Sequence, residues 1–352
     1  MMNLSTLKTL FLTTVFMLFG CLATQAADDG LITKQITIKL EKAGSLPDRI
    51  SRSKKYLITN LKIVGEVNGT DWQFIREMAG CDYNMEKTDG KLSILDLSDA
   101  KIVDGGKPYI YIDGYKRYTS NDKLGSYAFY GCSGFTSLTI PSSVTSMGES
   151  AFKGCSGLTS LVILSGVTSI GSWAFYGCIG LTNLTIPSSV TLIGDYAFKG
   201  CRSLTSLTIP SSVISIGESA FSGCIGLTSL TIPSSVTFIW DKAFSGCSGL
   251  TSIYVYPKKT PRLGTDIFSG CDAKNCKVYV PIGTYDDYLV SEFGYFENIV
   301  EFDATGIDKV TTSTDAKELS RYSVNGQRLS APAKGLNIVK YSDGSVKKVV
   351  VQ

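Results

Sequence analysis

The segment Leu181-Thr-Asn-Leu-Thr-Ile-Pro-Ser-Ser-Val190, followed shortly by Ala197-Phe198-Lys199-Gly200-Cys201, is one copy of a pattern that repeats along the chain. Cysteine recurs with it at a step of 23 residues, and once at a step of 24, at positions 132, 155, 178, 201, 224, 247 and 271. Self-similarity at a fixed period of this size is typical of a solenoid, a stack of similar turns in which each turn contacts only its neighbours. The period therefore predicts the architecture before any single residue is interpreted.

Each turn is expected to contain one short strand. In Leu158-x-x-Leu161-x-Ile163 the last two apolar side chains are two residues apart, which is the period of a strand with one buried face. Proline follows the strand in most copies, and Val190 and Ile193 then return the chain along the other side of the turn. The Ala-Phe pair closes the turn. Because so small a unit cannot offset the entropy of ordering its own backbone, stacking of the turns is obligatory.

The same frame continues, in weaker form, on both sides of the regular copies. Ile58-x-x-Leu61-x-Ile63 and Leu92-x-x-Leu95-x-Leu97 precede them, and Val278 to Pro281 has the composition of a last strand. We therefore expect a β-rich solenoid of nine stacked parallel strands, one per repeat of about 23 residues, capped at both ends. The expected divisions are a signal peptide at 1–26, an N-terminal cap with degenerate repeats at 27–123, regular repeats at 124–283, a C-terminal cap at 284–302, a linker at 303–320 and a small β tail at 321–352.

The first 26 residues have the features of an export signal. Lys8 precedes an apolar stretch from Leu10 to Leu22, which at about 13 residues is too short to span a bilayer. Small residues at Thr24 and Ala26 favour cleavage after Ala26, and lipoprotein processing at Cys21 is the alternative. No later segment is apolar and long enough to span a membrane. We therefore expect an exported protein that is secreted or attached to the cell surface.

Composition excludes several classes of function. The chain has ten cysteines, no histidine and a net charge of +3. Stacked turns place equivalent cysteines about 5 Å apart with parallel side chains, so we expect Cys132 to Cys271 to form a buried ladder of free thiols. Cys81 and Cys276 lie outside the period and remain available for pairing. Without histidine or a CxxC spacing we predict no metal site and no cofactor, and the small charge predicts no nucleic-acid partner.

The sequence also argues against catalysis. Without histidine it has no Ser/His or Cys/His pair for nucleophilic chemistry. The regular repeats carry carboxylates at one equivalent position, namely Glu149, Asp195, Glu218 and Asp241. These groups are expected in a row along the stack rather than across a cleft, as a glycosidase requires. We predict that the protein is not an enzyme.

Two outward surfaces are candidates for binding a partner. Between the inward Leu and Ile positions the strands carry Ser and Thr, such as Ser206 and Thr208, which suit a flat sheet face and offer hydroxyls to a glycan or peptide. Aromatic and lysine residues occur at two positions beside the Ala-Phe pair, and aromatic anchors carry much of the binding energy of protein interfaces. We therefore select this aromatic–lysine stripe as the candidate partner-binding site: Tyr130, Lys153, Trp173, Tyr176, Tyr196, Lys199 and Lys242. A separate cluster is interpreted as packing in a loop, with a sugar platform as the alternative: Tyr109, Tyr111, Tyr115 and Tyr118.

The repeat L-x-x-L-x-I-P-x-S-V-x-x-I-G-x-x-A-F-x-G-C, present in five consecutive copies from Leu158 to Cys271, resembles the BspA type of leucine-rich repeat. Leu164 and Gly166 interrupt one copy, and Trp240 replaces Gly in another. The resemblance implies a leucine-rich repeat solenoid at a bacterial cell surface, or secreted, with an adhesin-like role in binding host matrix or plasma proteins or other cells. The alternatives are a surface glycan-binding protein and a structural envelope spacer. The tail, 321–352, resembles the C-terminal sorting or anchoring segments of type IX secretion.

Overall fold

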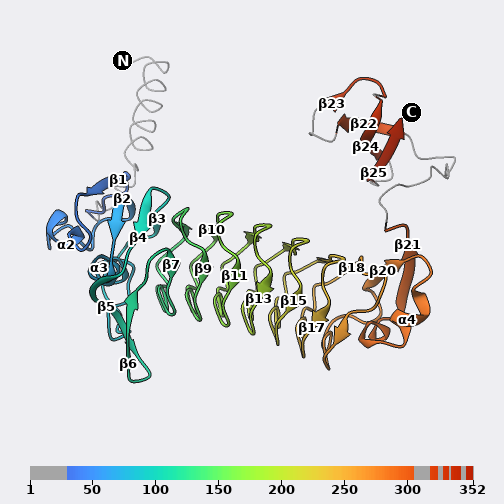
Figure 1. Ribbon diagram of the computed structural model, residues 1–352, viewed down its shortest axis with the longest axis horizontal. Helices are drawn as coiled ribbons and strands as arrows, with labels where there is room; N and C mark the ends of the chain where they lie inside the picture. The colour runs from blue at the N-terminus through green and yellow to red at the C-terminus, as the bar shows by residue number, and fades with distance from the viewer. Residues whose placement is uncertain (1–29, 305–317, 324–327, 333, 342–345, 352) are drawn as a thin grey trace, which may run out of the picture.

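The main body of the protein is an elongated stack of turns (Figure 1). The computed structural model describes residues 30–304, 318–323, 328–332, 334–341 and 346–351; the expected signal peptide, with Cys21, lies outside them. One 12-stranded sheet runs along the stack in the order β1-β2-β3-β8-β10-β12-β14-β16-β18-β20-β21, and β4 pairs with β2 outside this path. Neighbouring strands are parallel, as between β10 and β12 or β14 and β16. The predicted β-solenoid is therefore confirmed.

The strands of this long sheet are short in the regular turns and longer toward both ends. They are β1 (Ile36–Leu40), β2 (Asn60–Val67), β3 (Ile94–Asp96), β4 (Ala100–Ile102), β8 (Ser137–Thr139), β10 (Ser160–Val162), β12 (Asn183–Thr185), β14 (Ser206–Thr208), β16 (Ser229–Ile232), β18 (Ser252–Val255), β20 (Lys277–Pro281) and β21 (Asn298–Phe302). The expected number of nine strands was too low, because β1, β4 and β21 do not carry the Leu-x-x-Leu frame from which strands were counted.

A second parallel sheet runs along the opposite side of each regular turn. Its order is β19-β17-β15-β13-β11-β9-β7. Its members are β7 (Lys123–Leu124), β9 (Ser146–Met147), β11 (Ser169–Ile170), β13 (Leu192–Ile193), β15 (Ser215–Ile216), β17 (Phe238–Ile239) and β19 (Arg262–Leu263). The sequence predicts only the return of the chain here, because a strand of two residues is too short to show a period.

The register of both sheets follows the sequence period. Leu184 pairs with Leu161 of the preceding turn and with Leu207 of the following turn. Threonine side chains add hydrogen bonds between neighbouring turns: the hydroxyl of Thr182 donates to the carbonyl of Thr159, and that of Thr205 donates to the carbonyl of Thr182. Residues at equivalent repeat positions therefore stack on one another, which keeps the inward side chains on the buried face.

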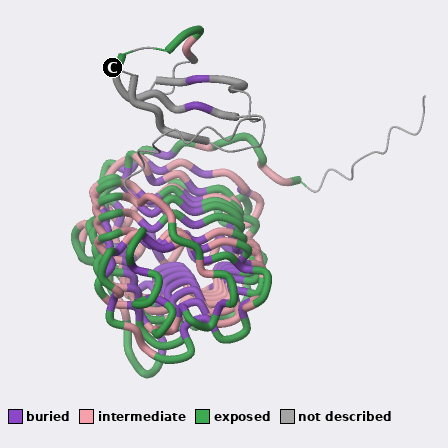
Figure 2. The backbone as a smooth tube through the Cα atoms, turned by 90° about the vertical axis from the view of Figure 1, so that its right-hand side faces the viewer, coloured by how far each residue is buried: buried purple, intermediate pink, exposed green. Residues whose placement is uncertain are grey.

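Buried residues recur at equivalent places in successive turns (Figure 2), and their side chains form columns in the core. Phe175, Phe198 and Phe221 are fully buried and stack in near-parallel planes with centroid separations of 5.0 and 5.2 Å. Beside them runs the cysteine column, in which the Cys201 thiol donates to the carbonyl of Phe175. The nine cysteines of the described residues are all free and buried, including Cys276. The predicted thiol ladder is present, and within the described residues no cysteine forms a disulfide.

The N-terminal cap closes the core with polar contacts as well as apolar ones. It contains α2 (Leu46–Arg49) and α3 (Gly69–Met78), and the α3 N-terminus has a capping box between Asn68 and Asp71. The Asp71 carboxylate also accepts a hydrogen bond from the amide of Leu46, at 2.9 Å. Arg76 is fully buried and donates to the carbonyls of Ala128 and Tyr130 in the first regular turn. These bonds fix the cap to the stack.

The tyrosine cluster forms a hairpin rather than the expected loop. Strands β5 (Gly105–Ile112) and β6 (Tyr115–Thr119) pair antiparallel. Tyr109 is buried and its hydroxyl donates to the carbonyl of Ser126 at 2.7 Å, so this tyrosine is a packing residue. Tyr111, Tyr115 and Tyr118 are exposed on the hairpin.

The C-terminal cap contains α4 (Tyr285–Leu289), a 3-10 turn η1 (Glu292–Tyr295) and β21. Phe293 and Phe296 cover the last ring of the aromatic column, Phe268, with centroid distances of 5.0 and 5.1 Å. The tail forms an antiparallel sheet of β22 (Glu318–Ser323), β23 (Arg328–Leu329), β24 (Gly335–Tyr341) and β25 (Val346–Val351). Its first strand begins at Glu318, inside the expected linker, most of which lies outside the described residues.

Candidate interaction surface

The aromatic–lysine stripe lies on the bend that follows each strand of the second sheet. Trp173 and Tyr196 have left-handed backbones there, with φ of 62° and 57°. The equivalent residues are left-handed in the other turns as well: Tyr127, Ser150, Ser219, Lys242 and Asp266. This conformation costs a non-glycine residue about 1–2 kcal/mol, and serine adopts it as readily as tryptophan here. The bend therefore has the same backbone conformation whether or not it carries an aromatic ring. The rings project from this bend but do not determine its shape.

Lys153 lies at the centre of the stripe, among rings from two turns. Its ammonium nitrogen is 4.7 Å from the ring centroid of Trp173, 5.2 Å from that of Tyr176 and 5.8 Å from that of Tyr130. Contacts of this kind are worth about 0.5–1 kcal/mol each at exposed sites. The sequence period predicts that these residues are neighbours, and the structure brings them together.

A second group of contacts continues the stripe toward the C-terminus. Trp173 stacks on Tyr196 with centroids 4.2 Å apart, and Lys199 lies 5.2 Å from the Tyr196 ring. The Tyr196 hydroxyl donates to the Glu218 carboxylate of the next turn. That hydrogen bond raises the pKa of Tyr196, so the phenol stays protonated. The rings are therefore held in place by contacts between turns.

The stripe differs from the expected set at its two ends. Tyr127 belongs to it, because its ring is 5.7 Å from that of Tyr130. Tyr127 was not among the expected residues, although it occupies the same repeat position as Trp173 and Tyr196. Lys242 lies two turns beyond Tyr196 at the same repeat position, with Ser219 between them, and is thereby separated from the rings of the stripe. The structure therefore joins six of the seven expected residues and leaves Lys242 apart.

A shallow groove adjoins the stripe on the side of the cysteine bend. It has a volume of about 380 Å³ and is lined by Tyr176, Gly177, Ile179, Lys199, Gly200, Arg202, Ser222, Gly223 and Ile225. Ile179 and Ile225 are both about half exposed, at 47% and 48%. Lys199 and Arg202 are the charged residues of this lining. The groove therefore offers apolar contact and positive charge next to the aromatic rings.

The other predicted surfaces have simpler structural roles. In β12 and β14 the residues Asn183, Thr185, Ser206 and Thr208 face outward, as the alternation predicts. In the carboxylate row, Asp195 accepts a hydrogen bond from the amide of Glu218 at 2.8 Å, so this carboxylate links two turns.

Within the described residues, no group of three or more Cys, Asp or Glu is placed to hold a metal ion. None of the described helices is long and apolar enough to cross a bilayer.

Comparison with known proteins finds a matching repeat family and several similar solved structures. A family model described as the BspA type leucine rich repeat region, in six copies, matches residues 122–251 and 168–300. A leucine rich repeat protein of T. pallidum is 34% identical over 46% of this chain and 72% of its own, with a TM-score of 0.42. A leucine rich cell surface protein of Faecalibacterium prausnitzii is 27% identical over 66% of this chain and 50% of its own, with a TM-score of 0.40. The chain thus spans about half the length of the Faecalibacterium protein.

A leucine-rich repeat protein of Bacteroides ovatus is 25% identical over 54% of this chain and 67% of its own, with a TM-score of 0.30. No curated protein matches the chain. The repeats matched by the family model coincide with the stacked turns described above and span half of the sequence. The chain therefore belongs to the BspA-type leucine-rich repeat family.

Proposed function

We propose that this protein is a non-catalytic cell-surface binding protein and that the aromatic–lysine stripe contacts a protein partner. The observation that supports the proposal is the continuous cluster from Tyr127 to Lys199, in which rings and lysines from neighbouring turns contact one another. Large, immobilised aromatic side chains lose little conformational entropy on binding, which is why they dominate protein interfaces. Export to the surface is supported by the apolar N-terminal stretch and by the cell-surface relative.

The chemistry of the surface also narrows the kind of partner. The groove beside the stripe combines the apolar side chains Ile179 and Ile225 with the cations Lys199 and Arg202, and none of its lining residues is acidic. Opposite charge across an interface favours encounter and excludes like-charged partners. The proposed partner is therefore a folded protein, such as an extracellular-matrix or plasma protein, that presents carboxylates around an apolar or aromatic side chain.

The test is direct binding of the full chain to a panel of matrix and plasma proteins, measured by surface plasmon resonance. In the variant Trp173→Ala/Tyr176→Ala/Lys199→Ala we expect the affinity for a bound partner to fall by at least about tenfold, because three anchors of one cluster are removed. The fold should be retained, because all three side chains project from the solenoid surface.

The matched control is Tyr111→Ala/Tyr115→Ala, which removes exposed tyrosines from the β5–β6 hairpin and leaves the stripe intact. This control should bind as the unmodified protein does. Equal losses in the two variants would assign binding elsewhere, and a folded protein that binds no member of the panel would count against a protein partner.

A further inference from the structure

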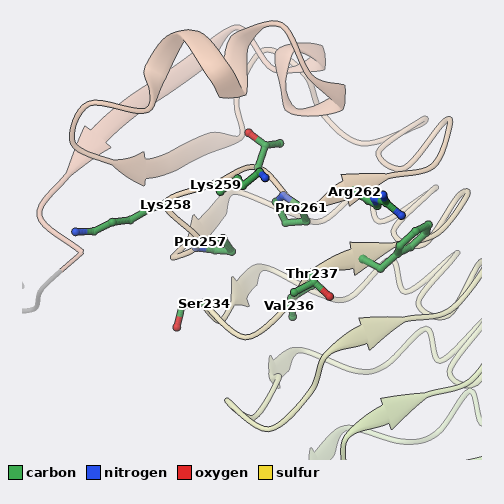
Figure 3. Close-up of a pocket in the computed structure, with 10 residues that line it drawn as sticks. Ser234, Val236, Thr237, Pro257, Lys258, Lys259, Pro261 and Arg262 are labelled. Carbon is green, nitrogen blue, oxygen red and sulfur yellow. The ribbon is translucent and has the colours of Figure 1, made fainter.

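A separate cleft lies between the last two turns of the second sheet (Figure 3). It has a volume of about 490 Å³. Its lining residues are Ser234, Val236, Thr237, Phe238, Pro257, Lys258, Lys259, Thr260, Pro261 and Arg262. None of them belongs to the aromatic–lysine stripe, so this cleft is a distinct surface of the molecule.

The cleft results from an extra residue in the loop between β18 and β19. Ile232 pairs with Val255, and Phe238 pairs with Arg262, so five residues connect the two strands in one turn and six connect them in the next. The additional residue widens the loop 256–261. This loop is fixed at both ends: Pro257 and Pro261 restrict its backbone, and the buried hydroxyl of Tyr288 donates to the carbonyl of Pro257 at 2.7 Å. The opening is therefore a built feature of the last turn.

The rim of the cleft is positively charged. Lys258, Lys259 and Arg262 are exposed, and no acidic residue lines the cleft. None of the three takes part in the ion pairs found among the described residues. Thr260 replaces the inward valine of the other turns, and its hydroxyl is buried without a hydrogen-bond partner. The loop thus brings two exposed lysines to a place where regular turns carry Ser-Ser.

An aromatic pair borders the same cleft. Phe238 lines it, and its ring centroid is 4.3 Å from that of Trp240, which is 47% exposed. In the other turns the position of Trp240 is glycine, where an added Cβ would approach backbone of the preceding turn, as at Gly194, to within 2.6 Å. The tryptophan therefore departs from a local packing rule in the turn beside the irregular loop. Departures of this kind concentrate at functional sites.

We propose that this cleft binds an acidic saccharide unit. Lys258, Lys259 and Arg262 would hold its carboxylate or sulfate, since charge-assisted hydrogen bonds are the strong ones. The hydroxyls of Ser234 and Thr237 are suited to the sugar hydroxyls, and the Phe238–Trp240 pair offers an apolar surface to the C–H face of the ring. A half-open cleft of about 490 Å³ between two turns suits one or two sugar units better than an extended peptide.

The test is isothermal titration calorimetry of the full chain at low salt with four probes. They are a hyaluronan tetrasaccharide, a heparin-derived tetrasaccharide, cellotetraose and a short poly-glutamate peptide. We expect one or both acidic tetrasaccharides to bind with an affinity that falls as salt is raised. The stronger of the two shows whether carboxylate or sulfate is recognised. Cellotetraose and poly-glutamate should bind at least tenfold more weakly.

Two variants locate the site. Lys258→Ala/Lys259→Ala/Arg262→Ala should weaken binding by at least about tenfold, and Trp240→Gly should weaken it several-fold while restoring the residue of the other turns. The control Lys34→Ala/Lys42→Ala/Lys101→Ala removes three exposed lysines of the N-terminal cap, outside both the stripe and the cleft, and should change nothing. Equal binding of poly-glutamate, equal loss in the control, or no binding by the folded protein would overturn the proposal. None of these results depends on whether the stripe binds a protein.

Discussion

Each cysteine of the ladder has a buried thiol, and burial disfavours the charged thiolate form. Burial raises the pKa of Cys224 to about 12 and that of Cys271 to about 11, from an ordinary value of 9.0. Cys81, which lies outside the ladder, behaves differently, because a hydrogen bond with Cys132 and the nearby Arg76 guanidinium lower its pKa to about 7. Among the cysteines that the structure describes, Cys81 is thus the one suited to ionise near neutral pH.

These shifts predict how stability changes with pH. In the unfolded chain a ladder thiol ionises near its ordinary value, whereas the folded chain keeps its proton until the raised pKa. Above pH 9 the folded state therefore binds more protons, and its free energy of unfolding falls as pH rises. The variant Cys224→Ala lacks the proton that the folded protein retains on this thiol. Between pH 9 and 11 its free energy of unfolding should therefore fall less steeply than that of the unmodified protein, by about 1.4 kcal/mol per pH unit.

Urea unfolding of the unmodified protein and of Cys224→Ala, at intervals from pH 8 to 10.5, measures this difference. Tyrosine and lysine titrate in the same range, but they are common to both proteins and cancel in the comparison. Parallel curves for the two proteins would show that Cys224 ionises alike in both states.

The bend that carries the stripe has a second left-handed position, which is glycine in all the regular turns. Gly177, Gly200 and Gly223 have φ of 71°, 75° and 73°. An added Cβ on Gly200 would meet its nearest atoms, in Gly177, at 4.0 Å, which is ordinary contact. Glycine is therefore needed here for its backbone conformation and not for space.

This distinction gives a prediction about two substitutions at one site. Gly200→Ala should destabilise the protein by about 1–2 kcal/mol, because alanine resists the left-handed conformation. Gly200→Asn should cost less although asparagine is larger, since its side chain tolerates that conformation. Chemical denaturation of both variants ranks them, and a greater loss for asparagine would mean that space decides.

The repeat period accounts for the stacking of the main strands but not for every element of the turn. The 23-residue period predicts the stacking of Leu161 on Leu184, and it predicts that Lys153 lies between Tyr130 and Tyr176. It does not reveal the second sheet, whose two-residue strands have no period, or the left-handed bends, which depend on φ. The basic cleft was missed for a different reason: the step of 24 was visible in the sequence, but only the structure shows that the extra residue opens the loop.

At the scale of the molecule, equivalence of the turns means that one whole repeat is removable. Deleting residues 182–204 joins Leu181 to Thr205, which occupies the position of Thr182 in the next copy. The shortened chain should fold, with a lower stability because one interface between turns is lost. Circular dichroism and thermal unfolding measure both properties.

A deletion that is one residue shorter, 182–203, is the matched comparison. It shifts the following strands by one position relative to the preceding turns and sets their apolar residues against the wrong faces. We expect it to unfold at a lower temperature than the full-repeat deletion. Equal stability of the two would show that the register is less strictly fixed than the pairing of equivalent leucines and threonines indicates.

Each turn is joined to the next by hydrogen bonds such as those that link Thr159, Thr182 and Thr205, so turns pulled along the axis should detach one after another. A turn of 23 residues that detaches adds about 75 Å of extended chain, while the remaining turns keep their contacts. Held between a cell and a surface in flowing liquid, such a molecule lengthens by increments and dissipates the pull, where a compact domain of the same size would yield at once.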